Sequence, residues 1–359
     1  MEDRNTEFLN TLLSEYTPSS YENFNGAYNK LIKFVKYKDY SVTNIGNVIF
    51  TKGSNREDAI KVMLSAHIDE NAFQVSKIDS NGMLRVQKLG GSDMKTIFGS
   101  HVFVACYDKY SSSPSKLIPG IIGKKAIHKE TGDERKKVSE IEDVIIDIGE
   151  SCYDEVNDMG VRIRSIVVFN HEYNIDFGCS NYFVSNALDD KIGIYAVSEA
   201  FNKINEDFLI SKNINLILVW ATQEEVGLRG ATVVSKYINP DYSIDVDVTF
   251  DTDIYSPKAN ENKIELSKGA VIEHGPCNSL SFDFVDMCEK YALSYQEEVH
   301  RPGGHNGSAI QMNSTNCKTQ HIGIPLRNMH TQVEMCSYKD VDSAIDVIQK
   351  YIENFEFCD

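Results

Sequence analysis

Two long, mainly apolar runs constrain the fold of this 359-residue chain more than any other sequence feature. The segments IKVMLSA, which begins at Ile60, and INLILVW, which begins at Ile214, lack the strict alternation expected of a half-exposed strand. Such runs are typical of parallel strands that are buried on both faces. From Asn181 onward, strand-like and helix-like segments alternate along the chain. The pattern therefore predicts an α/β fold whose sheet is covered by helices on both faces.

Apolar spacing places the individual elements. Helical spacing of apolar residues, as at Phe8, Leu9, Leu12 and Leu13, marks the expected helices, and short apolar runs mark the expected strands. The helices are predicted over residues 6–16, 27–37, 189–203, 228–238, 279–293, 307–314 and 339–355. The strands are predicted over residues 42–51, 60–66, 214–223 and 243–250.

The segment 73–169 has a different pattern. Short runs such as FQVSKI, HVFVACY and SIVVF are separated by Gly, Pro, Ser and charged clusters, which predicts a small all-β module. The charged stretch IHKETGDERKKVSEIED within it is interpreted as a solvated loop or flap. We therefore expect a discontinuous α/β domain, residues 1–72 and 170–359, with a β module inserted at 73–169.

Charge and composition exclude several classes of protein. The chain has 36 Lys and Arg against 53 Asp and Glu, a net charge of -17 that argues against nucleic-acid binding. The polar, acidic N-terminus does not resemble a secretory signal, and no run approaches the roughly 18 apolar residues that predict a membrane span. Eight cysteines without a Cys-x-x-Cys pair are expected to be reduced thiols, which favours a cytoplasmic protein.

Acidic and imidazole side chains follow the apolar runs in five places. Because ligands gather at the carboxyl ends of strands in open α/β sheets, these residues are candidates for a common site. The candidates are His67 and Asp69, Asp189 and Asp190, Glu224 and Glu225, the four residues Asp245, Asp247, Asp251 and Asp253, and His330.

The His67 and Asp69 pair is compatible with metal binding. His67 could bind a metal through one ring nitrogen while Asp69 accepts a hydrogen bond from the other nitrogen. A capping Asp beside a surface His is the alternative. In NALDDKIG, one of Asp189 and Asp190 could bridge two metal ions while the other caps a helix, and plain N-capping is again the alternative.

The adjacent pair Glu224 and Glu225 is the sharpest signal, because the preceding apolar run should be buried. Two such carboxylates repel each other unless a cation neutralises them. One could bind a metal and the other could take a proton from metal-bound water. On a solvent-facing helix, however, the same pair would be unremarkable.

The last two segments are less decisive. In SIDVDVTFDTD, alternation places Asp245, Asp247 and Asp251 on one face of a strand, and composition does not choose among the four aspartates. A lone residue such as His330 is often structural. Taken together, nitrogen and oxygen ligands without thiolate suit zinc, cobalt or manganese, and their number fits two ions about 3.5–4 Å apart.

The segments AHIDENAF, ALDDKIG, QEEVGLRGA, DVDVT and IPLRNMH, in this order, resemble the metal-site motifs of the TET-type aminopeptidases, which are metallopeptidase family forty-two. The resemblance implies hydrolysis of the N-terminal residue of peptides, a mixed sheet flanked by helices, an inserted β-barrel-like dimerisation domain, and homo-oligomers up to dodecamers. It also implies that Glu224 is the general base, that Asp69 orients His67, and that Asp189 bridges two ions. The implied metal ligands are His67, Asp189, Glu225, Asp247 and His330.

The chain departs from the family pattern in two places. Asn71 and Ala72 stand where the family has an apolar residue and glycine, and Gly303-Gly304-His305-Asn306 replaces Gly-Gly-Thr-Asp. His305 could therefore contact a metal or substrate, or fill space. These changes leave the preferred N-terminal residue open, and the candidate cations Arg301 and Arg327 do not decide it.

Three other functions are alternatives to the aminopeptidase interpretation. A pair of carboxylates could hydrolyse glycosides without metal, although two histidines and the additional carboxylates argue against it. A non-catalytic assembly or binding protein on the same scaffold would require a lost ligand or base, and the sequence has lost none. A dinuclear enzyme acting on another amide, such as an N-acyl amino acid, would use the same residues.

Overall fold

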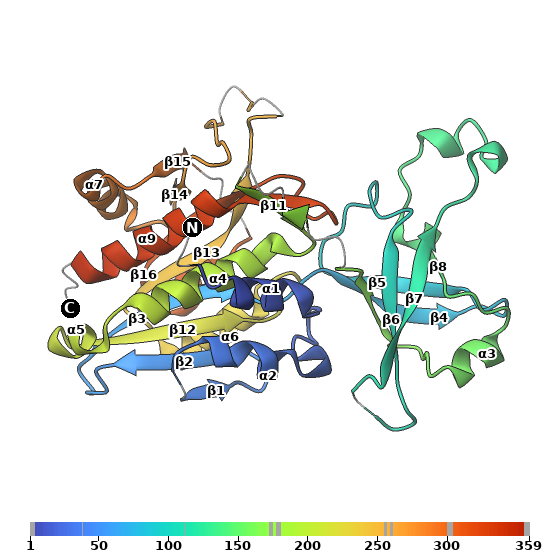
Figure 1. Cartoon of the computed structure of the whole chain (residues 1–359), viewed down its shortest axis with the longest axis horizontal. Helices are drawn as coiled ribbons and strands as arrows, with labels where there is room; N and C mark the ends of the chain where they lie inside the picture. Colours follow the sequence, from blue (N-terminus) through green and yellow to red (C-terminus); the bar gives the residue numbers. More distant parts are fainter. Residues whose placement is uncertain are drawn as a thin grey trace.

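The computed structural model describes residues 4–37, 39–111, 113–171, 175–176, 181–254, 257–258, 261–299 and 304–354. A helix-covered sheet lies beside a separate β-barrel (Figure 1). The sheet has eight strands. In spatial order they are β1 (Tyr40–Val42), β2 (Val48–Gly53), β12 (Ile214–Ala221), β3 (Ile60–His67), β13 (Tyr242–Phe250), β16 (Lys318–Leu326), β14 (Ala270–His274) and β15 (Tyr295–Val299).

The centre of this sheet is parallel. Strand β3 pairs in parallel with β12 and β13, and β13 pairs in parallel with β16, whereas β2 and β14 join antiparallel. The parallel pairing predicted from the two apolar runs is therefore confirmed, as is the mixed sheet. In β12, Leu218 and Trp220 belong to the core on one face, and Val219 belongs to the core on the other face. Both faces are buried, which explains the apolar character of the run.

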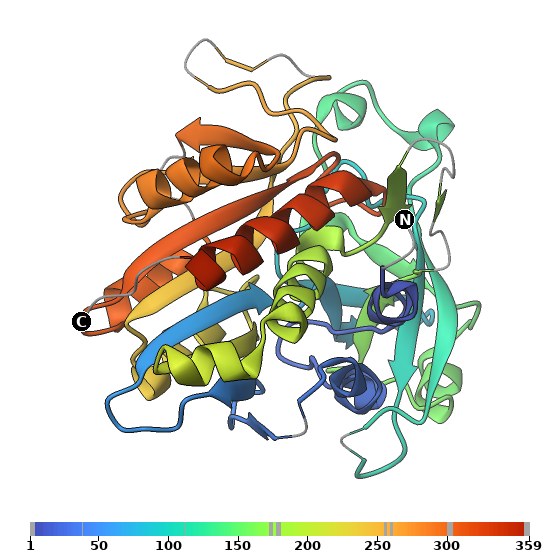
Figure 2. The same ribbon diagram turned by 60° about the vertical axis from the view of Figure 1, so that its left-hand side comes forward.

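Helices cover both faces of the sheet. The larger core includes residues of α1 (Thr6–Ser14), α4 (Leu188–Lys203), α7 (Ser281–Tyr291) and α9 (Tyr338–Asn354). The yellow-green helix α4 and the red helix α9 cross this face side by side (Figure 2). The smaller core on the opposite face includes residues of α6 (Arg229–Ile238) and α8 (Asn306–Asn313). Two short helices, α2 (Ala27–Leu31) and α5 (Glu206–Ser211), contact α1 and β2 respectively.

The barrel is closed and has its own hydrophobic core. A short helix, α3 (Tyr153–Asp158), accompanies the strands, and the segment predicted as a solvated loop has only 3-10 turns at Ile127–Lys129, Glu134–Lys136 and Ile141–Asp143. In order around the barrel, the strands are β4 (Ala72–Ile78), β5 (Leu84–Leu89), β8 (Ile145–Asp147), β7 (Lys116–Gly123), β6 (His101–Cys106) and β9 (Ile166–Phe169).

Several predicted elements differ from the structure. The single strand expected over 42–51 is wrong, because a turn over 43–47 folds β1 back onto β2, with Gly46 at a φ of 103°. The helix expected over 27–37 ends early, since a 3-10 turn at Ile32–Phe34 leads into extended backbone at Val35. Strands β14 and β15 were not predicted, nor was a three-stranded sheet of β10 (Ile175–Asp176), β11 (Tyr182–Ser185) and β17 (Glu334–Ser337). Residue 355 lies outside the described residues.

None of the helices in the described part of the chain is both long enough and apolar enough to cross a membrane.

A buried ion-pair network joins the segment after β3 to helix α4. The Glu70 carboxylate lies 3.3 Å from Lys191 Nζ and 2.9 Å from His171 Nε2, and it accepts the Thr17 N–H at 2.5 Å. Lys191 has no exposed surface, and Glu70 is 1% exposed. Burial acts to raise the pKa of Glu70, but Lys191 and His171 lower it to about 2.

Replacing Glu70 by Gln is expected to lower the free energy of unfolding at pH 7 by about 3–5 kcal/mol, because the buried Lys191 ammonium would lose the carboxylate with which it forms an ion pair. The Glu70 pKa is about 2 in the folded chain and 4.5 ordinarily, so the stabilisation is present above pH 4.5 and is lost as the pH falls toward 2.

Urea unfolding of wild type and Glu70→Gln at pH 7 and at pH 3 measures this difference, with Glu57→Gln at an exposed position as the matched control. The gap between wild type and Glu70→Gln should narrow at pH 3. A gap of equal size at both pH values would show that the Glu70 charge is not the cause.

Candidate metal centre

The parallel strands direct the candidate residues to one edge of the sheet. Strand β3 ends at His67, and the segment after β12 carries Glu224 and Glu225. Asp247 lies in the last half of β13, and His330 follows β16. Because these strands run in the same direction, their carboxyl ends meet, and Asp189 in the first turn of α4 faces the same edge.

Asp189 lies between two imidazoles. Its Oδ1 is 3.0 Å from His67 Nε2, and its Oδ2 is 3.1 Å from His330 Nε2. Asp189 is 7% exposed, and the carboxylate therefore presents each oxygen to a different histidine inside the protein. A carboxylate in this position can bridge two cations.

Two groups of potential metal ligands share this carboxylate. One consists of His67, Asp189 and Asp247, and the other consists of Asp189, Glu225 and His330; within each group one ligand atom per residue lies within 4.8 Å of the others. His67 Nε2 is 3.8 Å from Asp247 Oδ1, and His330 Nε2 is 3.9 Å from Glu225 Oε1. Imidazole nitrogens and carboxylate oxygens without thiolate form a ligand set suited to zinc, cobalt or manganese.

The buried carboxylates of this site would be stabilised in their ionised form by a bound cation. Burial, together with neighbouring carboxylates, raises the pKa of Glu224 well above its ordinary value and raises the pKa of Glu225 to about 8. Burial also raises the pKa of Asp247 to about 6. Buried carboxylates so close together cannot all ionise without compensation, and a bound divalent ion would supply it.

Glu224 belongs to neither ligand group. Its Oε2 is 3.9 Å from His67 Nε2, and its side chain is 10% exposed. It borders the pocket that also contains Asp189 and His330. A carboxylate beside the ligands, rather than among them, is placed to exchange a proton with a molecule bound in that pocket.

The contacts of Asp69 differ in part from the predicted hydrogen bond between its carboxylate and the His67 ring. His67 Nδ1 lies 3.0 Å from the main-chain oxygen of Asp69 and 3.6 Å from the Asp69 carboxylate. The carboxylate accepts the main-chain N–H groups of Glu224 at 2.9 Å and Glu225 at 3.2 Å, and also the Ser19 hydroxyl. Asp69 therefore fixes the backbone of the glutamate pair, and its main-chain oxygen contributes most closely to orienting the His67 ring.

The adjacent Asp190 has a different environment from Asp189. Its carboxylate accepts the main-chain N–H of His67 at 3.1 Å and that of Gly193 at 3.0 Å. Asp190 thus ties the end of β3 to the first turn of α4, which matches the capping alternative that the sequence left open for one member of the pair.

The four aspartates around β13 separate by their contacts. Asp247 lies near His67, whereas the Asp251 carboxylate accepts the Arg327 side-chain N–H. Asp253 lies 3.2 Å from Lys263 Nζ, and Asp245 faces a different pair of histidines. Only Asp247, among these four, joins the Asp189-centred groups in the described residues.

Three contacts of the site were missed from the sequence. The Glu334 carboxylate accepts the main-chain N–H of Asp189 at 3.2 Å and that of His330 at 2.7 Å. Asn71 donates its side-chain N–H to Glu225 at 2.8 Å, so one departure from the family pattern contacts a candidate ligand.

The third contact comes from the loop after β5. Gly91 donates its main-chain N–H to Glu225 at 3.3 Å, and a Cβ at Gly91 would lie 3.1 Å from His330 Nδ1. Nothing in the sequence pattern of 73–169 predicts this contact of Gly91. Asn71, in contrast, differs from the residue type found at its position in the family. Gly91 is thus a residue of the 73–169 module that contacts the candidate ligands.

A helix-covered mixed sheet, an inserted barrel, and two ligand groups that share one carboxylate define a candidate dinuclear metallohydrolase. The chain belongs to the M42 aminopeptidase family, since the family model described as M42 glutamyl aminopeptidase matches residues 46–347. Members of this metal-dependent family are hydrolases that act on peptide bonds. The predicted family and enzyme class are therefore confirmed.

Individual relatives agree with this assignment. The lysyl aminopeptidase of Pyrococcus furiosus is 33% identical over 328 residues, which cover 89% of this chain and 88% of the relative. The structure of an aminopeptidase from Desulfurococcus kamchatkensis superposes with a TM-score of 0.85 at 28% identity, over 97% of this chain and 94% of that one. The TET1 peptidase of Pyrococcus horikoshii, described as assembling into a tetrahedron or a large octahedral shell, gives a TM-score of 0.82 at 26% identity over 98% and 99% of the two chains.

Proposed function

We propose that this aminopeptidase works with two divalent metal ions, zinc in preference to cobalt or manganese, bound at the Asp189-centred groups. The observation that carries the proposal is that the two oxygens of Asp189 face His67 and His330 at 3.0 and 3.1 Å. Asp189 would bridge the ions, His67 and Asp247 would complete one set of ligands, and Glu225 and His330 would complete the other.

When bound, the two ions would polarise the scissile carbonyl and lower the pKa of a water molecule, which could then lose a proton and attack the carbonyl carbon. Glu224 would accept the proton of that water as general base and donate it to the leaving amine. Asp69 holds the Glu224 and Glu225 backbone through two hydrogen bonds, so it acts as a positioning residue. The buried Glu334 keeps Asp189 and His330 in place through their main-chain N–H groups.

The pocket beside the centre bears on substrate preference. Apolar side chains at Leu228, Val248, Phe250 and Met329 line it together with the candidate ligands, and its described lining includes no Lys or Arg. The Arg327 side chain donates a hydrogen bond to the Asp251 carboxylate. Arg301 lies outside the described residues. We therefore expect peptides with an apolar or basic first residue to be cleaved faster than those with an acidic one.

Hydrolysis of leucyl-, lysyl- and glutamyl-nitroanilides and of short peptides by metal-stripped protein tests the proposal. Activity should return on addition of Zn²⁺, Co²⁺ or Mn²⁺, and glutamyl substrates should be the slowest. Activity that is unaffected by a chelator would contradict metal-dependent catalysis. Two bound ions without release of any amino acid would favour another amide substrate or a binding role.

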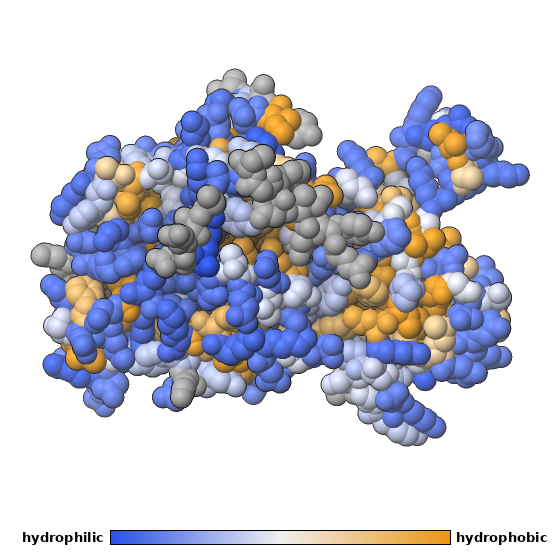
Figure 3. Space-filling view, viewed as in Figure 1, coloured by the Kyte–Doolittle hydropathy of each residue, from blue (hydrophilic) through white to orange (hydrophobic). Residues whose placement is uncertain are grey.

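We also propose that the chain is a cytoplasmic homo-oligomer built from dimers, with assemblies up to a dodecamer. The 73–169 module would be the dimerisation domain, and residues 1–72 and 170–359 would be the catalytic domain. Hydrophobic side chains gather on the barrel at the right of Figure 3. Exposed large hydrophobic residues of the module include Tyr110, Ile121, Ile127, Val138 and Ile163. Light scattering of the full chain should give a mass above that of a monomer.

A further inference from the structure

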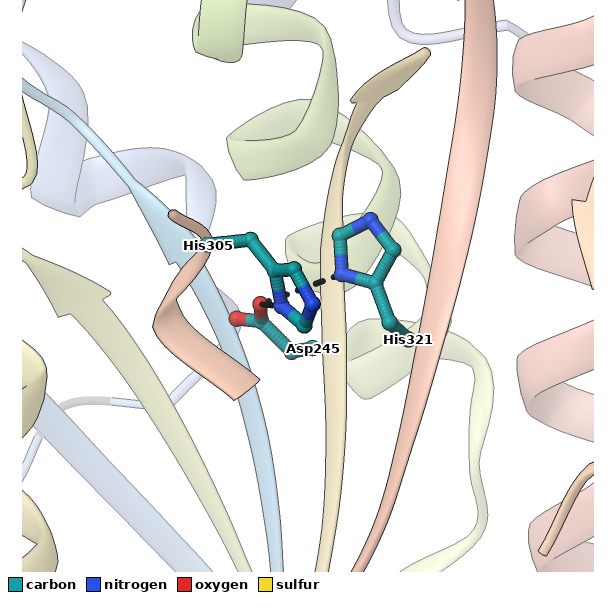
Figure 4. Close-up of side chains that lie close together, drawn as sticks. All are labelled: Asp245, His305 and His321. Carbon is teal, nitrogen blue, oxygen red and sulfur yellow. Dashed lines mark hydrogen bonds and ion pairs between the residues drawn. The ribbon is translucent and has the colours of Figure 1, made fainter. Parts of the chain in front are cut away.

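A second histidine and carboxylate cluster lies beside the candidate dinuclear centre. Asp245 of β13, His321 of β16 and His305, which immediately precedes α8, point toward one another (Figure 4). Asp245 Oδ2 is 3.3 Å from His321 Nδ1 and 3.6 Å from His305 Nδ1. All three residues are buried, and one ligand atom from each lies within 4.8 Å of the others. None of them belongs to the Asp189-centred groups.

The pairing of β13 with its two neighbouring strands brings Asp245 and His321 together. Asp245 pairs with Ser65 on β3 and with His321 on β16, so the three side chains lie in one row across the sheet. The Ser65 hydroxyl donates to Asp245 Oδ1 at 2.5 Å, and the Gly307 N–H donates to Oδ2 at 2.8 Å. The carboxylate is thereby held with Oδ2 directed at the two imidazoles.

The His305 ring has a buried nitrogen without a hydrogen bond. His305 is 7% exposed, and its Nδ1 makes no hydrogen bond with the described residues, although it is directed at Asp245. The neighbouring Asn306 side chain is 1% exposed, and both its polar atoms also lack a hydrogen bond with the described residues. Buried polar atoms are rarely left unpaired, so these atoms point to a ligand at this place.

The opposite nitrogens of both rings have partners of their own. His321 Nε2 is 3.4 Å from Glu273 Oε1, and His305 Nε2 is 3.5 Å from Cys277 Sγ. A neutral imidazole has one N–H, so His321 in its neutral form donates to only one of Asp245 and Glu273 and leaves the other carboxylate without that donor. A cation on the Asp245 side resolves this, since histidines that bind a metal commonly donate the other ring N–H to a carboxylate.

We propose that Asp245, His305 and His321 form a third metal site, for a divalent transition-metal ion such as zinc. Zinc bound tetrahedrally at about 2.0–2.2 Å places its ligand atoms roughly 3.3–3.6 Å apart, which agrees with the two measured distances from Asp245 Oδ2. His305 and His321 line the same pocket as His67 and His330. The ion would hold the segment before α8 against β13 and β16, and so would fix one wall of that pocket.

Metal counting tests the third site directly. Metal-stripped full-length wild type, His305→Gln and Asp245→Asn are equilibrated with Zn²⁺ alone, dialysed, and analysed for zinc per chain by mass spectrometry. Both variants should bind one ion fewer than wild type. His128→Gln, at an exposed position in the barrel module, is the matched control and should bind as many ions as wild type. Equal zinc content in wild type and in a folded His305→Gln or Asp245→Asn variant overturns the proposal.

The third site can fail independently of the proposed dinuclear centre. If only the dinuclear centre binds metal, wild type and His305→Gln both bind two ions. If only the third site binds metal, wild type binds one ion and His305→Gln binds none. Absorption of the Co²⁺-loaded proteins gives a second measurement that does not depend on activity. The visible bands of wild type should lose one component in His305→Gln, and identical spectra would contradict the third site.

Discussion

Glu224→Gln is expected to lower kcat by about 10²–10⁴-fold, while the zinc content per chain stays at the wild-type value. The substitution keeps the size of the side chain and removes its ability to accept a proton. Glu224 lies outside both Asp189-centred ligand groups, and its main-chain N–H remains bonded to Asp69. Hydrolysis of the best nitroanilide at saturating concentration, measured beside zinc analysis of the same samples, separates the two effects.

Glu225→Gln is the matched comparison, because the two glutamates are adjacent and only Glu225 is in a ligand group. Glu225→Gln should lose zinc affinity as well as activity, and part of its activity should return at high Zn²⁺ concentration. A Glu224→Gln variant that keeps more than a tenth of the wild-type kcat would show that another group is the base.

Much of this centre could be predicted from local sequence. Each candidate follows an apolar run, and parallel strands bring their carboxyl ends together whatever the details of the loops. The adjacent Glu224 and Glu225 stood out for the same reason, since a buried strand must deliver them to its end. The resemblance to the family then selected Asp247 from four aspartates, and the structure places that residue 3.8 Å from His67.

Other contacts depend on strand order and could not be predicted from local pattern. Asp245 meets His321 because β13 pairs with β16, which are 76 residues apart at this point. Gly91 reaches Glu225 from the barrel, and no periodicity links the two segments. Strands β14 and β15 are short, and the polar composition of the edge strand β15, YQEEV, gives no apolar run from which to predict it.

Because the two ligand groups share Asp189, a substitution of Asp189 should affect both groups, whereas a substitution of any other ligand should affect only one. Asp189→Asn is expected to remove two zinc ions per chain relative to wild type. Asparagine has about the same shape, but its NH₂ group cannot bind a cation, so one of the two oxygens that face His67 and His330 is lost together with the negative charge. The fall in affinity should exceed the roughly 10–100-fold typical for loss of a supporting hydrogen-bond partner.

His330→Gln supplies the comparison, because His330 occurs in one group only. It should remove one ion and leave the ion beside His67 and Asp247. Zinc titrations of wild type, Asp189→Asn and His330→Gln, followed by calorimetry, distinguish a shared ligand from two separate ones. If Asp189→Asn loses a single ion, as His330→Gln does, then Asp189 binds one ion without bridging, and the second ion must depend on Asp247 and His67 alone.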